Sequence, residues 1–255
     1  MGGMFDEPQV IGCPPLRIGG PTHVDGRTRY QQFTQPSGIG AVGGNDGAAR
    51  CQARFEGTGL GGGFERILAW VAEFRATDAT TPIVLMGYLN PIEIYGYARF
   101  AEQAHAAGVD GVLIVDVPVE ESGSVERLRD AGIRQIFLVA PTTTELRLAA
   151  IRERAQGFVY YVSFAGITGA TQLGPVEVRR RVDHIKQGGD IPVAVGFGVR
   201  DAATAVTVSA SADAVVIGSA LVARLAEAED AESAVSVARD FLAPIREALD
   251  LAAAA

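Results

Sequence analysis

From residue 64 onward, short apolar segments alternate with segments whose apolar residues recur at helical spacing. In the first amphipathic segment, 64–74, the residues Ile67, Leu68, Val71 and Phe74 share one helical face. The alternation predicts strands at 82–88, 111–116, 135–140, 158–163, 192–196 and 214–217. It predicts helices at 64–74, 91–107, 119–131, 144–156, 175–186 and 201–209, and a long closing helix that ends near residue 249. This alternation is typical of an α/β fold with a parallel sheet.

The first quarter of the chain shows neither the strand period nor the helix period. Residues 1–63 contain 16 of the 31 glycines and both cysteines. A segment so rich in glycine and proline loses much entropy on folding and buries little apolar surface. We therefore divide the chain into an atypical segment, 1–56, which reads as disordered or frameshifted, and a β/α barrel domain, 57–255.

The length of 255 residues fits one (β/α)8 barrel, which needs roughly 250. Six strands are recognisable, so the first two would have to come from the first 60 residues, where the pattern does not reveal them. A doubly wound open sheet is the alternative that the alternation by itself leaves open.

Composition narrows the class of protein further. A net charge of −8 argues against a nucleic-acid partner, because phosphates require clustered Lys and Arg. No apolar run approaches the roughly 18 residues of a membrane span, and the start lacks a signal-peptide pattern, so we expect a cytoplasmic protein with no membrane contact. Cys13 and Cys51 lack metal-site or redox spacing and the three histidines are scattered, so no metal site is expected.

Small and polar residues follow several of the predicted strands, at the end where a β/α barrel carries its active site. Gly198, Gly218 and Ser219 come at strand ends just before helices, where unpaired backbone N–H groups and the helix dipole favour an anion. Two such turns on consecutive strands predict a phosphate site, whereas a single one would be read as a tight turn. Tyr88 and Tyr160 also lie at strand ends, where they would line an apolar pocket or serve only as core or rim aromatics.

Asp116 follows an apolar strand in the stretch VDVPVEES and has two readings. As a strand-end acid it would point into the barrel mouth, for proton transfer or for binding a polar group of a substrate. As a structural acid it would cap the following helix, with Pro118 at the start of that helix.

Five segments together resemble the tryptophan synthase alpha subunit family in order and spacing, from about Gly57 to the end: PIVLMGYLNPIEIYG, GVDGVLIVDVPVEES, GFVYYVSFAGITGA, VAVGFGVR and VVIGSALV. The resemblance implies a (β/α)8 barrel and a lyase of tryptophan biosynthesis, itself without a cofactor. It would cleave indole-3-glycerol phosphate by a retro-aldol reaction to indole and glyceraldehyde 3-phosphate. The indole would pass to a pyridoxal-phosphate beta subunit in an alpha–beta heterotetramer.

The resemblance also implies roles for individual residues. Backbone groups of four residues would hold the substrate phosphate: Gly169, Gly198, Gly218 and Ser219. The substrate pocket and its closing loop would include Tyr88, Asp116, Tyr160, Thr168 and Phe197.

The two carboxylates that the family uses for proton transfer lie upstream of the matching region, in segments that this chain does not contain. Family spacing leads back to YQQFTQPSGIGAVGG, which has no acid, and Asp46 is a candidate remnant of the second motif. With one lysine beside 21 arginines, the sequence suggests GC-rich coding, and we hypothesise that residues 1–56 reflect a frameshift or a wrong start. Three functions follow: a working lyase subunit, a catalytically impaired subunit that binds phosphate and docks to the beta subunit, or another phosphate-binding barrel enzyme.

Overall fold

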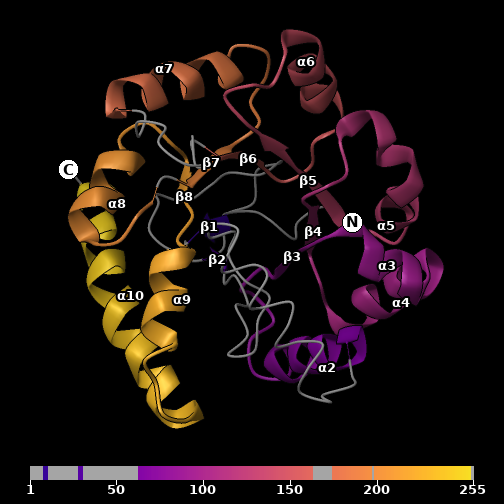
Figure 1. Cartoon of the computed structure of the whole chain (residues 1–255), viewed down its shortest axis with the longest axis horizontal. Coiled ribbons are helices and arrows are strands. Elements are labelled where there is room, and N and C mark those ends of the chain that lie inside the picture. Colours follow the sequence, from indigo (N-terminus) through magenta and orange to yellow (C-terminus); the bar gives the residue numbers. More distant parts are fainter. Residues whose placement is uncertain (1–7, 11–27, 31–62, 163–173, 197, 254–255) are drawn as a thin grey trace.

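Six parallel strands follow one another around the centre of the molecule in chain order, from β3 to β8 (Figure 1). They are β3 (Val84–Gly87), β4 (Gly111–Ile114), β5 (Arg134–Val139), β6 (Val159–Val162), β7 (Val193–Gly196) and β8 (Ala214–Val215). The computed structural model describes residues 8–10, 28–30, 63–162, 174–196 and 198–253. All six predicted strands are thus confirmed.

Two further strands, β1 (Pro8–Val10) and β2 (Thr28–Tyr30), pair in parallel with each other, and β1 contacts β8. They lie in the centre of Figure 1 with the other strands. The six-stranded sheet keeps the chain order from β3 to β8, so it shows none of the reversal that a doubly wound sheet requires. The architecture is the predicted β/α barrel. Most of the segment 1–56 lies outside the described residues, and its interpretation as disordered or frameshifted stays a prediction.

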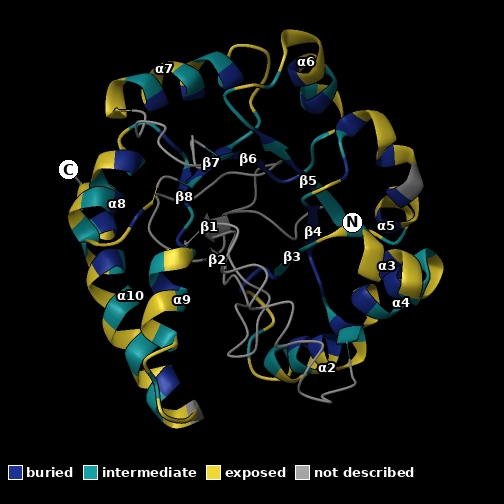
Figure 2. Ribbon diagram, in the orientation of Figure 1, coloured by how far each residue is buried: buried dark blue, intermediate teal, exposed yellow. Residues whose placement is uncertain are grey.

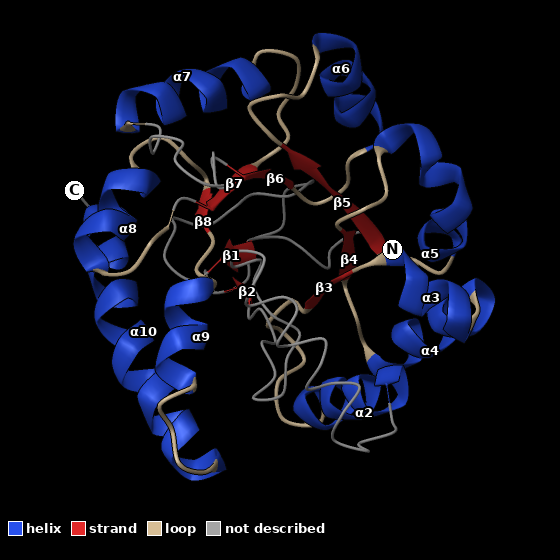
Figure 3. Ribbon diagram, viewed as in Figure 1, coloured by secondary structure: helices blue, strands red, loops and turns tan. Residues whose placement is uncertain are grey.

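The helices form a ring around the strands (Figure 3). They are α2 (Gly63–Arg75), α3 (Leu89–Tyr95), α4 (Tyr97–Ala107), the 3-10 helix η1 (Val119–Val125), α5 (Glu126–Asp130), α6 (Glu145–Arg154), α7 (Pro175–Lys186), α8 (Ala202–Ser209), α9 (Ser219–Leu225) and α10 (Ala231–Ala253). Their inward faces are buried and their outward faces exposed, as Figure 2 shows. In the part of the chain that the structure describes, none of these helices is both long and apolar enough to cross a membrane.

The predicted helix 91–107 is two helices, because Gly96 interrupts it. The chain turns at Gly96 with φ +94, a conformation that favours glycine, and its N–H closes α3 on the carbonyl oxygens of Ile92 and Glu93. Gly108, with φ +90, ends α4 directly after the predicted helix end at residue 107. The sequence pattern stayed helical across Gly96, so only its backbone conformation reveals the break.

Two other predicted helices also differ in detail. The segment 119–131 opens with η1 and becomes α-helical only at Glu126. The long closing helix is divided into α9 and α10, and Asp230 caps the second by accepting a hydrogen bond from the Ser233 backbone N–H at 2.8 Å. Pro244 lies inside α10 without ending it.

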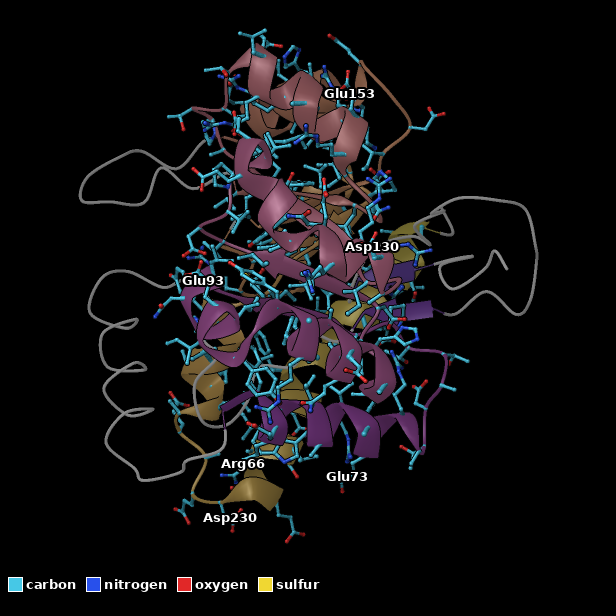
Figure 4. The ribbon with its side chains drawn as sticks, turned by 90° about the vertical axis from the view of Figure 1, so that its right-hand side faces the viewer. Arg66, Glu73, Glu93, Asp130, Glu153 and Asp230 are labelled. Carbon is cyan, nitrogen blue, oxygen red and sulfur yellow. The ribbon has the colours of Figure 1, made fainter. Side chains whose placement is uncertain are left out.

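Figure 4 shows the two ends of the barrel from the side. Glu73, Asp130 and Glu153, near the C-terminal ends of α2, α5 and α6, lie toward one face, and Arg66 and Glu93 lie toward the other. Each helix follows a strand and begins near the C-terminal end of that strand. The face that carries Arg66 and Glu93 is therefore the one where the strands end. We call it the mouth of the barrel, and it carries the predicted site residues.

Candidate active site

Six described residues from the predicted site follow strands at the mouth or lie within one. Tyr88 follows β3, Asp116 follows β4, Tyr160 lies on β6, Gly198 follows β7, and Gly218 with Ser219 follows β8. Three further site residues, Gly169, Thr168 and Phe197, lie outside the described residues, as does Asp46.

The turns after β7 and β8 have the backbone features that the phosphate prediction needs. Gly198 adopts φ +55, in the left-handed region, and is exposed. Gly218 is the N-cap of α9 with φ −123 and ψ −89, and no side chain of its own caps that helix. Ser219 is the first residue of α9 and is exposed. The first N–H groups of α9 have no acceptor within the helix and lie beside small residues.

The side chain of Tyr160 extends from β6 to the neighbouring strand β7, where it lies against Gly196. A Cβ atom built on Gly196 would lie 2.8 Å from Cε2 of Tyr160, closer than real Cβ contacts come. Burial raises the pKa of the Tyr160 hydroxyl to about 12. Gly196 was not singled out as a site residue in the sequence, although it stands two positions before Gly198.

Asp116 caps a helix, but not the one that the sequence suggested. Its Oδ1 accepts a hydrogen bond from the backbone N–H of Leu89, the first residue of α3, at 2.8 Å. The helix that follows Asp116 starts at Val119 after Pro118, and no side-chain hydrogen bond caps it. The prediction that Asp116 caps the following helix was therefore wrong. Its carboxylate instead contacts α3, the helix that follows the preceding strand β3.

Tyr88 is the N-cap residue of α3, and its side chain is 49% exposed. Asn90, two residues later, is exposed as well. Both residues therefore lie at the rim of the mouth and not in the core.

A shallow hollow lies between α7 and α8 and reaches Gly198. Its other walls come from Pro175, Val178, Thr207 and Val208, on the flanks of the two helices. Gly198 is the one described site residue that borders it, so we do not identify this hollow with the predicted substrate pocket.

Carboxylates are sparse at the mouth. Within the described ranges, the acids that come within five residues after a strand are Asp116 and Asp201. Asp201 is occupied as the N-cap of α8, where it accepts from the Thr204 N–H at 2.8 Å. No group of three or more metal-ligating side chains occurs among the residues that the structure places.

Comparison with known proteins agrees with this arrangement. The family model for the tryptophan synthase alpha chain matches residues 46–249. The tryptophan synthase alpha chain of Xanthomonas euvesicatoria pv. vesicatoria (strain 85-10) is 53% identical over 194 residues, which are 75% of this chain and 72% of that protein. The corresponding protein of Xylella fastidiosa (strain M12) is 51% identical over 191 residues, 74% of this chain and 71% of the relative.

Solved structures show the same likeness. Tryptophan synthase subunit alpha from Legionella pneumophila str. Paris superposes with a TM-score of 0.72 at 34% identity, over 88% of this chain and 81% of that one. A chain of the tryptophan synthase a2b2 complex from Pyrococcus furiosus superposes with a TM-score of 0.65 at 32% identity, over 86% and 84%. With its barrel, its strand-end glycines and the match over residues 46–249, the chain belongs to the tryptophan synthase alpha chain family.

Proposed function

We propose that this chain is a tryptophan synthase alpha subunit, a lyase that cleaves indole-3-glycerol phosphate to indole and glyceraldehyde 3-phosphate. The observation that carries the proposal is the pair of glycine turns after β7 and β8, in a chain that matches the family over residues 46–249. The role is part of aromatic amino-acid biosynthesis, and the expected location is the cytoplasm.

The substrate phosphate would be held by backbone N–H groups rather than by a cation. Gly198 and Gly218 leave room for close approach to the main chain, and the first turn of α9 adds N–H donors at Ser219. Gly169 completes the set by family resemblance. A site of this type needs no lysine, which suits a chain whose sole lysine, Lys186, is ion-paired with Asp213 at 2.5 Å.

The indole ring would occupy the apolar part of the mouth. Tyr88 and Phe197 would contact the ring, Tyr160 would stand beside the reacting groups, and Thr168 would belong to the loop that closes over the substrate. The raised pKa of Tyr160 keeps its hydroxyl protonated at neutral pH, so this group can donate a hydrogen bond but does not act as a base.

The reaction breaks the bond between the indole ring carbon and the hydroxyl-bearing side-chain carbon. A base takes the proton from that hydroxyl, whose oxygen becomes the aldehyde oxygen of glyceraldehyde 3-phosphate. The electron pair of the broken bond passes to the ring, and an acid delivers a proton to the ring carbon to give indole. Two positioned carboxyl groups suit these transfers, and each general acid or base typically contributes about 100- to 10,000-fold.

The catalytic carboxylates are not identified among the described residues. Asp201 is committed to its helix cap and Asp116 accepts from the Leu89 N–H, which leaves Asp46 as the sequence candidate. If no acid serves, the chain is the catalytically impaired alternative, which binds phosphate and docks to the beta subunit without turnover.

The test is indole release from indole-3-glycerol phosphate by the purified chain, with and without a pyridoxal-phosphate beta subunit. Turnover that Asp46→Asn lowers at least about 100-fold would establish the lyase and assign this residue. No indole release, together with retained binding of glyceraldehyde 3-phosphate and co-elution with the beta subunit, would establish the impaired alternative. Loss of both binding and co-elution would refute the proposed function.

A further inference from the structure

The hydrogen-bond ladder between β3 and β4 continues past the strands through a side chain. Gly87 pairs with Ile114 at the end of the ladder, and the Val115 N–H donates to the Gly87 carbonyl oxygen at 2.9 Å. The next link along β3 is the Leu89 N–H, which donates to Oδ1 of Asp116 at 2.8 Å. The side chain of Asp116 thus replaces a main-chain partner where the two chains diverge toward their helices.

The first turn of α3 needs such an acceptor. The first N–H groups of a helix have no partner within it, and a carboxylate there also interacts favourably with the helix dipole. Tyr88, the N-cap residue, has φ −105 and ψ 160 and offers no side-chain hydrogen bond. Asp116 therefore supplies from β4 the cap that the local sequence of α3 does not provide.

This contact determines where Tyr88 stands. The carbonyl group before Tyr88 and the N–H group after it are both hydrogen-bonded to the chain that follows β4. The Tyr88 side chain is 49% exposed, so packing contributes little to its placement. Without the Asp116 contact, the Leu89 N–H next to Tyr88 would lose this acceptor.

Asp116 itself is attached to a well-anchored segment. Val117 and Val119 on its C-terminal side are 6% and 1% exposed. Arg154 of α6 donates to the Val119 carbonyl oxygen at 2.7 Å and to Oγ of Ser122 at 3.2 Å. The carboxylate therefore extends from a fixed base toward the start of α3.

We propose that Asp116 is a positioning residue for Tyr88, acting by capping α3 from the neighbouring strand. The inference rests on the proposed function, in which Tyr88 lines the indole pocket. It assigns the acid a role through hydrogen-bond acceptance, so the negative charge and the proton of Asp116 take no part in the reaction.

Two substitutions of Asp116 and one matched control test this role. Asp116→Ala removes the acceptor, whereas Asp116→Asn keeps an oxygen in the same place and removes the acid. Asp230→Ala removes an exposed cap of the same 2.8 Å geometry from α10. Asp230 lies at the lower edge of the molecule in Figure 4, apart from Glu93 on α3.

The first readout is amide hydrogen exchange at Leu89 without any ligand, and the second is the Kd of an uncleavable indole-3-alkyl phosphate. Asp116→Ala should speed exchange at Leu89 and raise the Kd roughly 2- to 30-fold, the range expected for a lost helix cap. Asp116→Asn should restore both values to within about threefold of the parent chain, because Asn caps helices as well as Asp. Asp230→Ala should change neither.

Unchanged exchange at Leu89 in Asp116→Ala would overturn the proposal, as would an Asn variant as impaired as the Ala variant, because the charge would then be required. A parent chain that fails to bind the analogue would refute the proposed function. The exchange data would still show whether Asp116 holds the start of α3, so the two failures can be told apart.

Discussion

The chemistry of Tyr160 depends on its surroundings. Its ring lies against Gly196 of the neighbouring strand, in the space that a Cβ atom on Gly196 would fill. Burial disfavours the phenolate and raises the pKa of the hydroxyl to about 12. A raised folded-state pKa contributes stability that is fully present below the unfolded value of about 10 and is lost as pH rises through about 12.

We expect Tyr160 to be among the last of the six tyrosines to ionise. In an ultraviolet titration, the difference between the parent chain and Tyr160→Phe isolates the phenolate of this residue. Its absorbance should develop above pH 11, because burial holds the proton. A difference signal that is complete by pH 10.5 would show that the hydroxyl is solvated and would contradict the burial argument.

A substitution at Gly198 should show whether phosphate binding depends on the backbone conformation of the turn after β7. With φ +55 it occupies the left-handed region, which costs an L-residue about 1–2 kcal/mol. Gly198→Ala should raise the Kd for glyceraldehyde 3-phosphate about 5- to 30-fold if the turn reverts to an ordinary conformation and withdraws its N–H groups. Isothermal titration calorimetry measures this change directly.

Gly189→Ala is the matched control, because its φ is not in the left-handed region and its Cβ would meet no atom within 4 Å. It should leave phosphate affinity unchanged and alter the unfolding free energy by no more than about 0.5 kcal/mol. Equal affinities of the two variants for glyceraldehyde 3-phosphate would show that Gly198 does not contribute to phosphate binding.

At the scale of elements, one buried ion pair joins three parts of the chain at the face opposite the mouth. The Arg75 guanidinium at the end of α2 is paired with Asp110 and donates to the Gly108 carbonyl oxygen at 2.9 Å and the Thr81 carbonyl oxygen at 2.5 Å. Asp110 also accepts from the Ile83 N–H at 2.6 Å. Burial raises the pKa of Asp110, and the Ile83 hydrogen bond and the charges of Arg75 and Arg134 offset that effect only in part.

Arg75→Ala should therefore lower the free energy of unfolding by about 3–5 kcal/mol, because it removes the guanidinium that is paired with a buried carboxylate. The control is Glu65→Ala, which breaks the Arg99–Glu65 pair, where both side chains are more than half exposed and the expected loss is below about 1 kcal/mol. Urea denaturation compares the two. Similar small losses would show that Asp110 is solvated once Arg75 is gone.

The sequence predicted the elements well where the apolar pattern was local and continuous. All four residues of β4 are buried, so its run of apolar residues was a sufficient signal. The pattern failed at Gly96, because a glycine inside a helical pattern is compatible with either a continuous helix or a break. It also failed at β1 and β2, three-residue strands too short to show a period of two.

Only those features of the site that depend on residues adjacent in the sequence could be predicted. Gly198 and Gly218 were found because a glycine between strand and helix has a local meaning. The partner of Asp116 was not found, because Leu89 is 27 residues earlier and meets it only through strand pairing. The contact between Tyr160 and Gly196 was missed for the same reason.

At the scale of the whole molecule, the buried apolar residues that the structure describes form two clusters rather than one. One cluster includes Leu68, Leu128 and Ile133, from α2 to the start of β5, and the other includes Leu148 and the buried residues of β5 to β8. The strand β4 lies between them, since Val112 and Ile114 belong to the first cluster and Leu113 to the second. Alternate side chains of one strand thus face different cores.

Because each cluster has its own contacts, we expect the two parts of the barrel to unfold at different urea concentrations. The single tryptophan, Trp70, lies on α2 and reports on the first cluster, whereas far-ultraviolet circular dichroism reports on both. Leu128→Ala should lower the fluorescence midpoint, and Leu148→Ala should lower only the dichroism transition of the second cluster, each through a loss of about 2–5 kcal/mol. Leu146→Ala, at a position 87% exposed on the same helix as Leu148, should change neither transition. If both core variants shifted both probes equally, the two clusters would be one cooperative unit, and β4 would transmit the loss of packing from one side of the barrel to the other.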